Sequence, residues 1–199
     1  MVNIKDQYYD VLREIGNIGA GNATTALSQL LNTRIDMTVP RVKLMEFKEV
    51  GTTMGGEDQL VAGIYLAVEG DVTGSIMFIQ KKESARNMVS KLMGMEPGGE
   101  DLNEMELSAL KEIGNIITGA YLNSLSTLTN LVIYPSVPEL CIDMAGAIMS
   151  VPAIEFGTIG DRILMIQTDF SDEADMSGYF ILMPDEESYD RILHALGVC

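Results

Sequence analysis

The sequence contains no tryptophan, one histidine, His194, and two cysteines, Cys141 and Cys199. With a single imidazole, we expect neither a catalytic triad nor an imidazole-rich metal site. Two cysteines can form neither a disulfide framework nor a cysteine zinc site, and they favour a reduced, cytoplasmic chain. We therefore predict no metal site and no cofactor of the protein's own. Its chemistry must come from carboxylates, amides and hydroxyls, or from groups on a partner.

Basic residues are also scarce. Lysine and arginine number 13 against 29 acidic residues, which gives a net charge of −16. Nucleic-acid binding needs a basic surface, and an anionic membrane would repel this chain. The longest apolar runs, such as residues 60–68, are too short to span a bilayer, and the first residues do not resemble a secretory leader. We expect a soluble cytoplasmic protein with no nucleic-acid partner and no membrane insertion.

The chain contains two related halves. Glu14-Ile15-Gly16-Asn17-Ile18 recurs unchanged as Glu112-Ile113-Gly114-Asn115-Ile116, an offset of 98 residues. The same offset relates Val39-Pro40 to Val137-Pro138. Further along the offset is 104, where Gly74 corresponds to Gly178. Similarity over most of the length predicts an internal repeat.

Each half has the same expected order: a long helix, three strands and a closing helix. Asn3 with Asp6, and Asp101 with Glu104, are candidate helix starts. The second half carries an additional segment at 143–156, predicted as a short helix. The expected helices are 3–31, 82–93, 101–129 and 186–196, and the expected strands are 34–44, 59–69, 71–80, 131–142, 162–170 and 176–184.

The boundary between the halves, at residues 96–101, is only a turn. We therefore predict one domain, 1–199, made of repeats 1–98 and 99–199, with an α/β fold of the α+β type. Strands of both halves would share one sheet, on which the long helices pack. Two independent domains are the alternative, but they would leave several strand edges open. The internal two-fold favours a monomer.

The candidate site is a polar stripe on each long helix. Asp10, Glu14, Asn17 and Gly21 are spaced to share one helical face. The second helix repeats the stripe, as Ser108, Glu112, Asn115 and Gly119. A carboxylate can pair with a cation, and a carboxamide can hold a water in one orientation. Two copies at corresponding points favour a function over a merely solvated helix face.

Glycines inside these helices are unfavourable by about 1 kcal/mol each relative to alanine. We interpret Gly19 and Gly21 as positions where the two long helices pack closely. Gly16 and Gly114 lie beside the Glu-Asn pairs, where a missing side chain would admit another backbone. A phosphate-binding loop at 16–21 is rejected, because no strand precedes it and the helical pattern continues through it.

The long-spaced pattern resembles a known family. Asp10, Glu14, Asn17 and Pro40 recur as Ser108, Glu112, Asn115 and Pro138. This pattern is similar to that of the CheC phosphatases of bacterial chemotaxis, in the CheC/CheX/FliY group. CheX-type members carry one intact motif, and FliY-type members add a C-terminal domain, so two motifs in 199 residues resemble CheC proper.

The resemblance implies that the chain dephosphorylates CheY, a receiver domain with an aspartyl phosphate, a bound Mg²⁺ and an active-site lysine. Glu14 and Glu112 would pair with that lysine, while Asn17 and Asn115 would orient the attacking water. Asp10, Ser108, Gly16 and Gly114 would support the two sites. This fits phosphoryl transfer, which needs positioning more than covalent chemistry.

The family also implies a second partner, the deamidase CheD. Segment 143–156 is one candidate for its binding surface, although an ordinary core helix is the favoured interpretation. A non-enzymatic adaptor that binds CheD or the flagellar switch is the alternative function. A stand-alone small-molecule hydrolase is disfavoured, since the sequence shows no self-contained nucleophile.

Overall fold

The computed structural model describes residues 6–32, 34–37, 41–95, 99, 101–156, 162–171 and 175–197. Both halves contain the same types of element in the same order. The first half comprises α1 (Asp6–Leu30), β1 (Asp36–Met37), β2 (Arg41–Glu46), α2 (Phe47–Thr53), β3 (Leu60–Gly70), β4 (Gly74–Lys81) and α3 (Lys82–Met93). The second comprises α4 (Glu104–Thr129), β5 (Ile133–Pro135), β6 (Glu139–Met144), α5 (Ala145–Phe156), β7 (Arg162–Ser171), β8 (Asp175–Pro184) and α6 (Glu186–Ala195).

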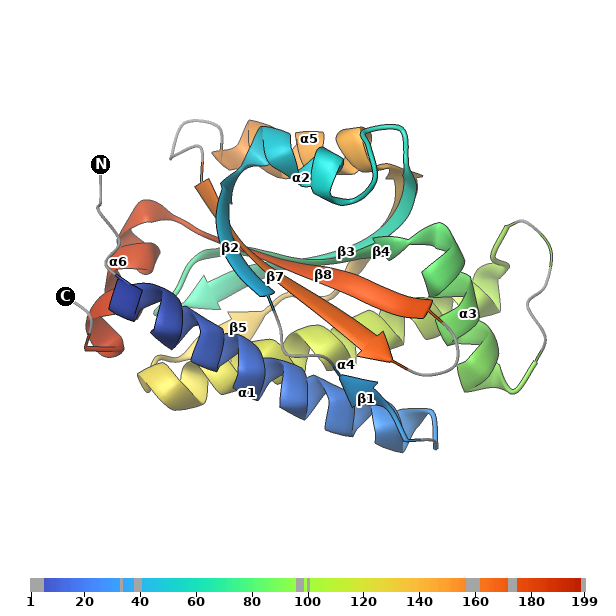
Figure 1. Ribbon diagram of the computed structural model, residues 1–199, viewed down its shortest axis with the longest axis horizontal. Coiled ribbons are helices and arrows are strands. Elements are labelled where there is room, and N and C mark those ends of the chain that lie inside the picture. Colours follow the sequence, from blue (N-terminus) through green and yellow to red (C-terminus); the bar gives the residue numbers. More distant parts are fainter. Residues whose placement is uncertain are drawn as a thin grey trace.

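One antiparallel sheet holds the strands of both halves, in the order β1-β7-β8-β4-β3-β5, with β2 also on β7 and β6 also on β3. In Figure 1, α1 and α4 lie on one side of the sheet and α2 and α5 on the other. The predicted α/β class of the α+β type, with a shared sheet, is confirmed. Because β1 and β2 pair with a second-half strand, and β5 and β6 with a first-half strand, each half depends on the other for its hydrogen bonds.

The two halves meet at the centre of the sheet, where β4 pairs with β8. At the repeat offset of 104, Met77 corresponds to Ile181, and these two residues face each other in the register. A two-fold axis through this pair would produce that arrangement. The pairing therefore fits two equivalent halves that are joined edge to edge within one sheet.

Side chains of the central strands alternate between two apolar clusters. On β4, Ile76 and Phe78 belong to the larger cluster, which includes residues of α1, α3, α4 and α6. Met77 and Ile79 belong to the smaller cluster, with Val50 of α2 and Ile148 of α5 among its members. Both faces of the sheet are covered, which explains the nearly continuous apolar run in β4.

The helices α1 and α4 contact each other beside a stack of rings that joins α4 to the sheet. A side chain at Gly19 would place its Cβ 2.5 Å from Cδ1 of Tyr121 on α4. The Tyr121 ring lies 3.9 Å, between centroids, from Phe180 of β8, which is 4.8 Å from Phe78 of β4. Gly19 is thus a packing glycine, as predicted, because its missing side chain leaves room for Tyr121.

Element boundaries agree best with the sequence where a cap marks them. The helix α3 spans the predicted residues, and Gly94 ends it with a left-handed φ of 63°. The helix α4 starts later than predicted, because Asn103 and not Asp101 caps it, in a capping box with Glu106. Asp101 is instead bound to Lys82 of α3, with 2.7 Å between carboxylate oxygen and Nζ.

Two further expectations need correction. The strand predicted over 131–142 is two strands, β5 and β6, because proline at 138 has no N–H for a sheet ladder. The segment 143–156 is not an addition to the second half alone. Its helix α5 has 12 residues, and the first half has its counterpart α2, of 7 residues. Within the described ranges, no helix is long and apolar enough to cross a bilayer.

Candidate functional site

The first stripe lies on the solvent-facing side of α1. Glu14 is exposed and Asn17 half-buried, whereas Ile15 and Gly16 between them are buried. Asp10 lies in the second turn of the same helix, and Pro40 falls outside the described residues. The i, i+3 spacing therefore presents a carboxylate and a carboxamide together at the surface.

The second stripe reproduces this environment on α4. Ser108 and Glu112 are exposed and Asn115 is half-buried, whereas Ile113 and Gly114 are buried. Pro138 is half-buried, between β5 and β6. Each Glu-Asn pair thus projects from a helix whose opposite face is fixed in the core.

The four side chains of the two pairs are available to a partner. Among the described residues, none forms a hydrogen bond or an ion pair with the side chain of Glu14, Asn17, Glu112 or Asn115. By contrast, Asn22 and Ser124, further along the same two helices, hydrogen-bond to each other at 2.9 Å. Polar side chains on these helices therefore do find partners where the helices touch, and the two pairs lie away from that contact.

The two pairs are separated along the crossing of their helices. Each precedes the contact made by Gly19 with Tyr121 and by Asn22 with Ser124. In Figure 1, α1 runs from left to right and α4 from right to left. The pairs therefore lie on opposite sides of the helix crossing, which presents them as two separate sites.

Gly114, beside the second pair, needs a different explanation from the one that the sequence suggested. A Cβ at Gly114 would lie 2.2 Å from Cδ1 and 2.8 Å from Cγ2 of Ile64, a fully buried residue of β3. The space left by this glycine is filled by the protein's own core, not by an approaching partner. Gly21, predicted to pack between the helices, has no atom within 4 Å of the point where a Cβ would lie, so that prediction is wrong.

A groove beside the second pair was not anticipated. Ser108 and Lys111 of α4 line it together with Lys82 and Asp101, and its volume is about 660 Å³. Only Ser108 stood out in the sequence, as a member of the stripe. The signal that could have revealed the groove is the pair of lysines in a strongly acidic chain, but they are 29 positions apart and meet only in the fold.

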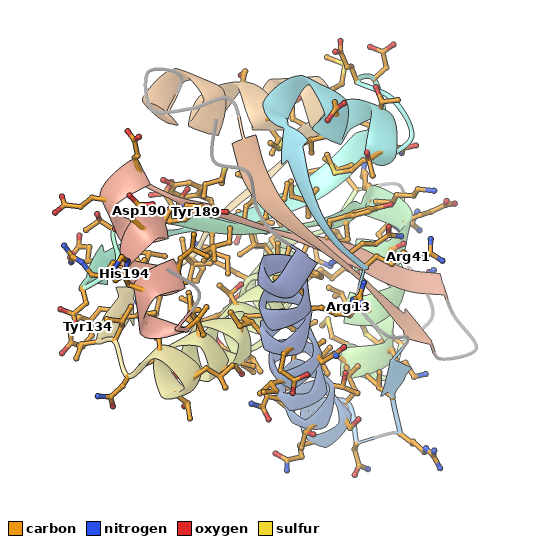
Figure 2. The ribbon with its side chains drawn as sticks, turned by 60° about the vertical axis from the view of Figure 1, so that its left-hand side comes forward. Arg13, Arg41, Tyr134, Tyr189, Asp190 and His194 are labelled. Carbon is orange, nitrogen blue, oxygen red and sulfur yellow. The ribbon has the colours of Figure 1, made fainter. Side chains whose placement is uncertain are left out.

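Other titratable groups lie outside the two stripes. His194 is exposed near the end of α6, and Figure 2 shows it on the outer side of that helix, near Asp190. Cys141 is a free, exposed thiol on β6. Among the described side chains, no three His, Cys, Asp or Glu residues cluster as metal ligands would.

A known protein family matches this chain in the two regions that contain the stripes. The profile of the CheC-like family matches residues 9–44 and 105–142, which contain both Glu-Asn pairs. The CheY-P phosphatase CheC of Bacillus subtilis is 42% identical, over 98% of this chain and 96% of that protein. The structure of Thermotoga maritima FliY has a TM-score of 0.76 at 22% identity, covering 99% of this chain and 98% of that one.

A more distant structure has the same fold. It is the CheX-CheY-BeF₃-Mg²⁺ complex from Borrelia burgdorferi, with a TM-score of 0.52 at 18% identity, covering 84% of this chain and 96% of the matched chain.

Proposed function

Because the chain belongs to the CheC-like family, we propose that it is a phosphatase that hydrolyses the aspartyl phosphate of a phosphorylated CheY-type receiver domain. The relative from B. subtilis, similar over almost the full length of both chains, supports this activity. The observation that carries the proposal is the two Glu-Asn pairs at the surface, Glu14 with Asn17 and Glu112 with Asn115, whose side chains have no partner within the described residues.

The division of labour between the two proteins explains how so few groups suffice. Phosphoryl transfer depends mainly on positioning and on stabilising charge. The receiver supplies Mg²⁺ and a lysine, both of which stabilise negative charge on the phosphoryl oxygens. This chain then needs only to dock and to place a water, which a carboxylate and a carboxamide can do.

Each residue of the pair has one role in this scheme. Glu14 and Glu112 form an ion pair with the receiver lysine, which fixes the orientation of the complex. Asn17 and Asn115 enter beside the phosphoryl group, where the amide accepts from and donates to one water and holds it in line for attack. An asparagine is not a base, so its contribution is the position of the water.

The surrounding residues support this geometry. Asp10 and Ser108 stand one turn before the glutamates, at the edge of the proposed contact. Gly114 lets α4 approach β3 closely, which sets the height of Asn115 above the sheet. We assign Gly16 the corresponding role on α1, where it is also buried.

We further propose that the protein acts in the cytoplasm as a monomeric single domain and also binds the deamidase CheD. The predicted CheD surface includes α5, whose residues Ala145, Ile148 and Met149 are buried in the smaller apolar cluster. Those side chains serve the fold, so a docking surface on α5 would use its remaining residues.

The test is the lifetime of a phosphorylated CheY-type receiver. Inorganic phosphate release is measured with Mg²⁺ present, with and without the purified chain, at substoichiometric amounts. The proposal expects multiple turnovers and a rate above spontaneous hydrolysis. A receiver that binds the chain yet keeps its spontaneous lifetime would instead support the adaptor function.

A further inference from the structure

The groove beside the second pair combines cationic and apolar groups. Its apolar lining consists of side chains from β3, β6, α4 and the segment just before α4, namely Leu60, Leu102, Leu107, Leu140 and Ile142. Its cations are Lys82 and Lys111, of which Lys111 is exposed. Lys82 is held in place, because Asp101 binds its Nζ at 2.7 Å. Two lysines and one carboxylate, that of Asp101, line the groove, so its lining is net positive in a chain of charge −16.

The groove is continuous with the second Glu-Asn pair. Ser108 is four residues before Glu112, and Lys111 is four residues before Asn115. Residues at i and i+4 lie one above the other on a helix. A protein that reaches Asn115 and Glu112 therefore meets the mouth of the groove one turn closer to the N-terminus of α4.

The first half provides an internal comparison. At the repeat offsets, Lys82 corresponds to Glu186 and Ser108 to Asp10, while Lys111 corresponds to Arg13. At two of these three positions, the first site therefore has an acidic residue where the second site has a lysine or a serine. The fold accommodates acidic residues at these positions, so the lysine and the neutral serine of the second site are not required by the shared architecture.

We propose that this groove docks the acidic rim of the phosphorylated receiver, next to its phosphoryl group, and that it makes the second Glu-Asn site the stronger of the two. The inference rests on the proposed function, because it takes the receiver as the occupant. A receiver holds Mg²⁺ with carboxylates, and phosphorylation adds further negative charge. The leucines and isoleucine would cover apolar side chains that flank this acidic rim.

Charge complementarity at the edge of an interface acts mainly on association. The kinetic effect of the lysines should therefore be on KM for the receiver, with kcat unchanged. The test uses two single-site enzymes. Asn17→Ala leaves only the second pair intact, and Asn115→Ala leaves only the first.

Lys82→Glu reproduces the first site's charge at the second. In the Asn17→Ala background we expect it to raise KM for the phosphorylated receiver about two- to fivefold, the range of a partly exposed ion pair. In the Asn115→Ala background it should change nothing. Before any charge change, Asn17→Ala should have the lower KM of the two single-site enzymes.

Two control variants separate docking from structural damage. Asp101→Asn breaks the same ion pair as Lys82→Glu but makes the groove more basic, so a docking effect predicts that it lowers KM or leaves it unchanged. If Lys82→Glu acts only by breaking the ion pair, both Lys82→Glu and Asp101→Asn should raise KM. Lys81→Glu changes an exposed neighbour outside the groove by the same charge and should have no effect.

Three results would overturn the inference. One is an unchanged KM with Lys82→Glu in the Asn17→Ala background. The second is an equal rise in both backgrounds, and the third is a rise with Asp101→Asn. Failure of the proposed function has a different signature, because no form of the chain would then accelerate phosphate release; the groove proposal would fall with it.

Discussion

A methyl group added at Gly114 would test how α4 is seated on the sheet. The new Cβ would lie 2.2 Å from Cδ1, 2.8 Å from Cγ2 and 3.0 Å from Cγ1 of Ile64. Favourable contacts between carbon atoms are about 3.5–4.0 Å long, so either the Ile64 side chain or α4 must move by roughly 1 Å. Ile64 is 0% exposed, and its branched Cβ restricts rotation about χ1, so Cγ1 and Cγ2 cannot easily move away even if Cδ1 turns aside. Such overpacking costs about 1–3 kcal/mol.

The same substitution elsewhere in α4 separates packing from helix propensity. Alanine in place of glycine stabilises a helix by about 1 kcal/mol. Gly119 lies on the same helix and has no atom within 4 Å of an added Cβ. Gly119→Ala should therefore raise the free energy of unfolding by about 1 kcal/mol. The free energy of unfolding of Gly114→Ala should be lower than that of Gly119→Ala by the cost of overpacking, about 1–3 kcal/mol.

The assay is urea unfolding of the two variants, with the denaturant slope m checked for constancy. Ile64→Val removes the Cδ1 atom of the closest contact, so it should recover part of the loss when combined with Gly114→Ala. Equal stabilisation by Gly114→Ala and Gly119→Ala would refute the reasoning, because Gly114 would then have open space beside it.

The remaining predictions concern caps and a buried hydroxyl. Asn103→Ala removes the cap of α4 and should cost about 1 kcal/mol in urea unfolding. Partial burial raises the pKa of Asp185, but hydrogen bonds from Thr73 and Ser188 outweigh it and hold this pKa below its usual range. Since the carboxylate stabilises the fold above the unfolded-state pKa of about 3.9, the destabilisation by Asp185→Ala should be full at neutral pH and shrink as acid protonates the folded carboxyl. Thr118 is 0% exposed, and no described residue forms a hydrogen bond with its Oγ1, so Thr118→Val should raise the free energy of unfolding by about 1–3 kcal/mol. A lower free energy of unfolding in this variant would instead point to an unrecognised hydrogen bond.

The long helices and the central strands could be predicted because their signals are local. The period of apolar residues indicates α1 and α4, and Gly94 marks the end of α3 in sequence and structure alike. The helix α2 escaped prediction because its seven residues include Gly51 and the β-branched Val50, Thr52 and Thr53. It is stabilised by distant residues, as the contact of Tyr179 Oη with the Thr53 carbonyl illustrates.

The site likewise has features that the local sequence predicts and features that depend on distant residues. The identical pentapeptides made the two Glu-Asn pairs visible, and their exposure on α1 and α4 agrees with the predicted helical face. The function of Gly114 could not be read locally, because Ile64, which fills its space, is 50 residues away in the sequence. The start of α4 was misplaced for a related reason, since Asp101 is engaged by Lys82 of another helix.

The most direct test of the central claim is the rate of phosphate release from a phosphorylated CheY-type receiver in the presence of the Asn17→Ala, Asn115→Ala double variant. Both side chains are half-buried at the surface and have no partner within the described residues, so their removal should leave stability in urea nearly unchanged. We expect the double variant to leave the receiver close to its spontaneous rate of hydrolysis, while each single variant retains activity. A folded double variant that accelerates hydrolysis as the unmodified chain does would contradict this expectation.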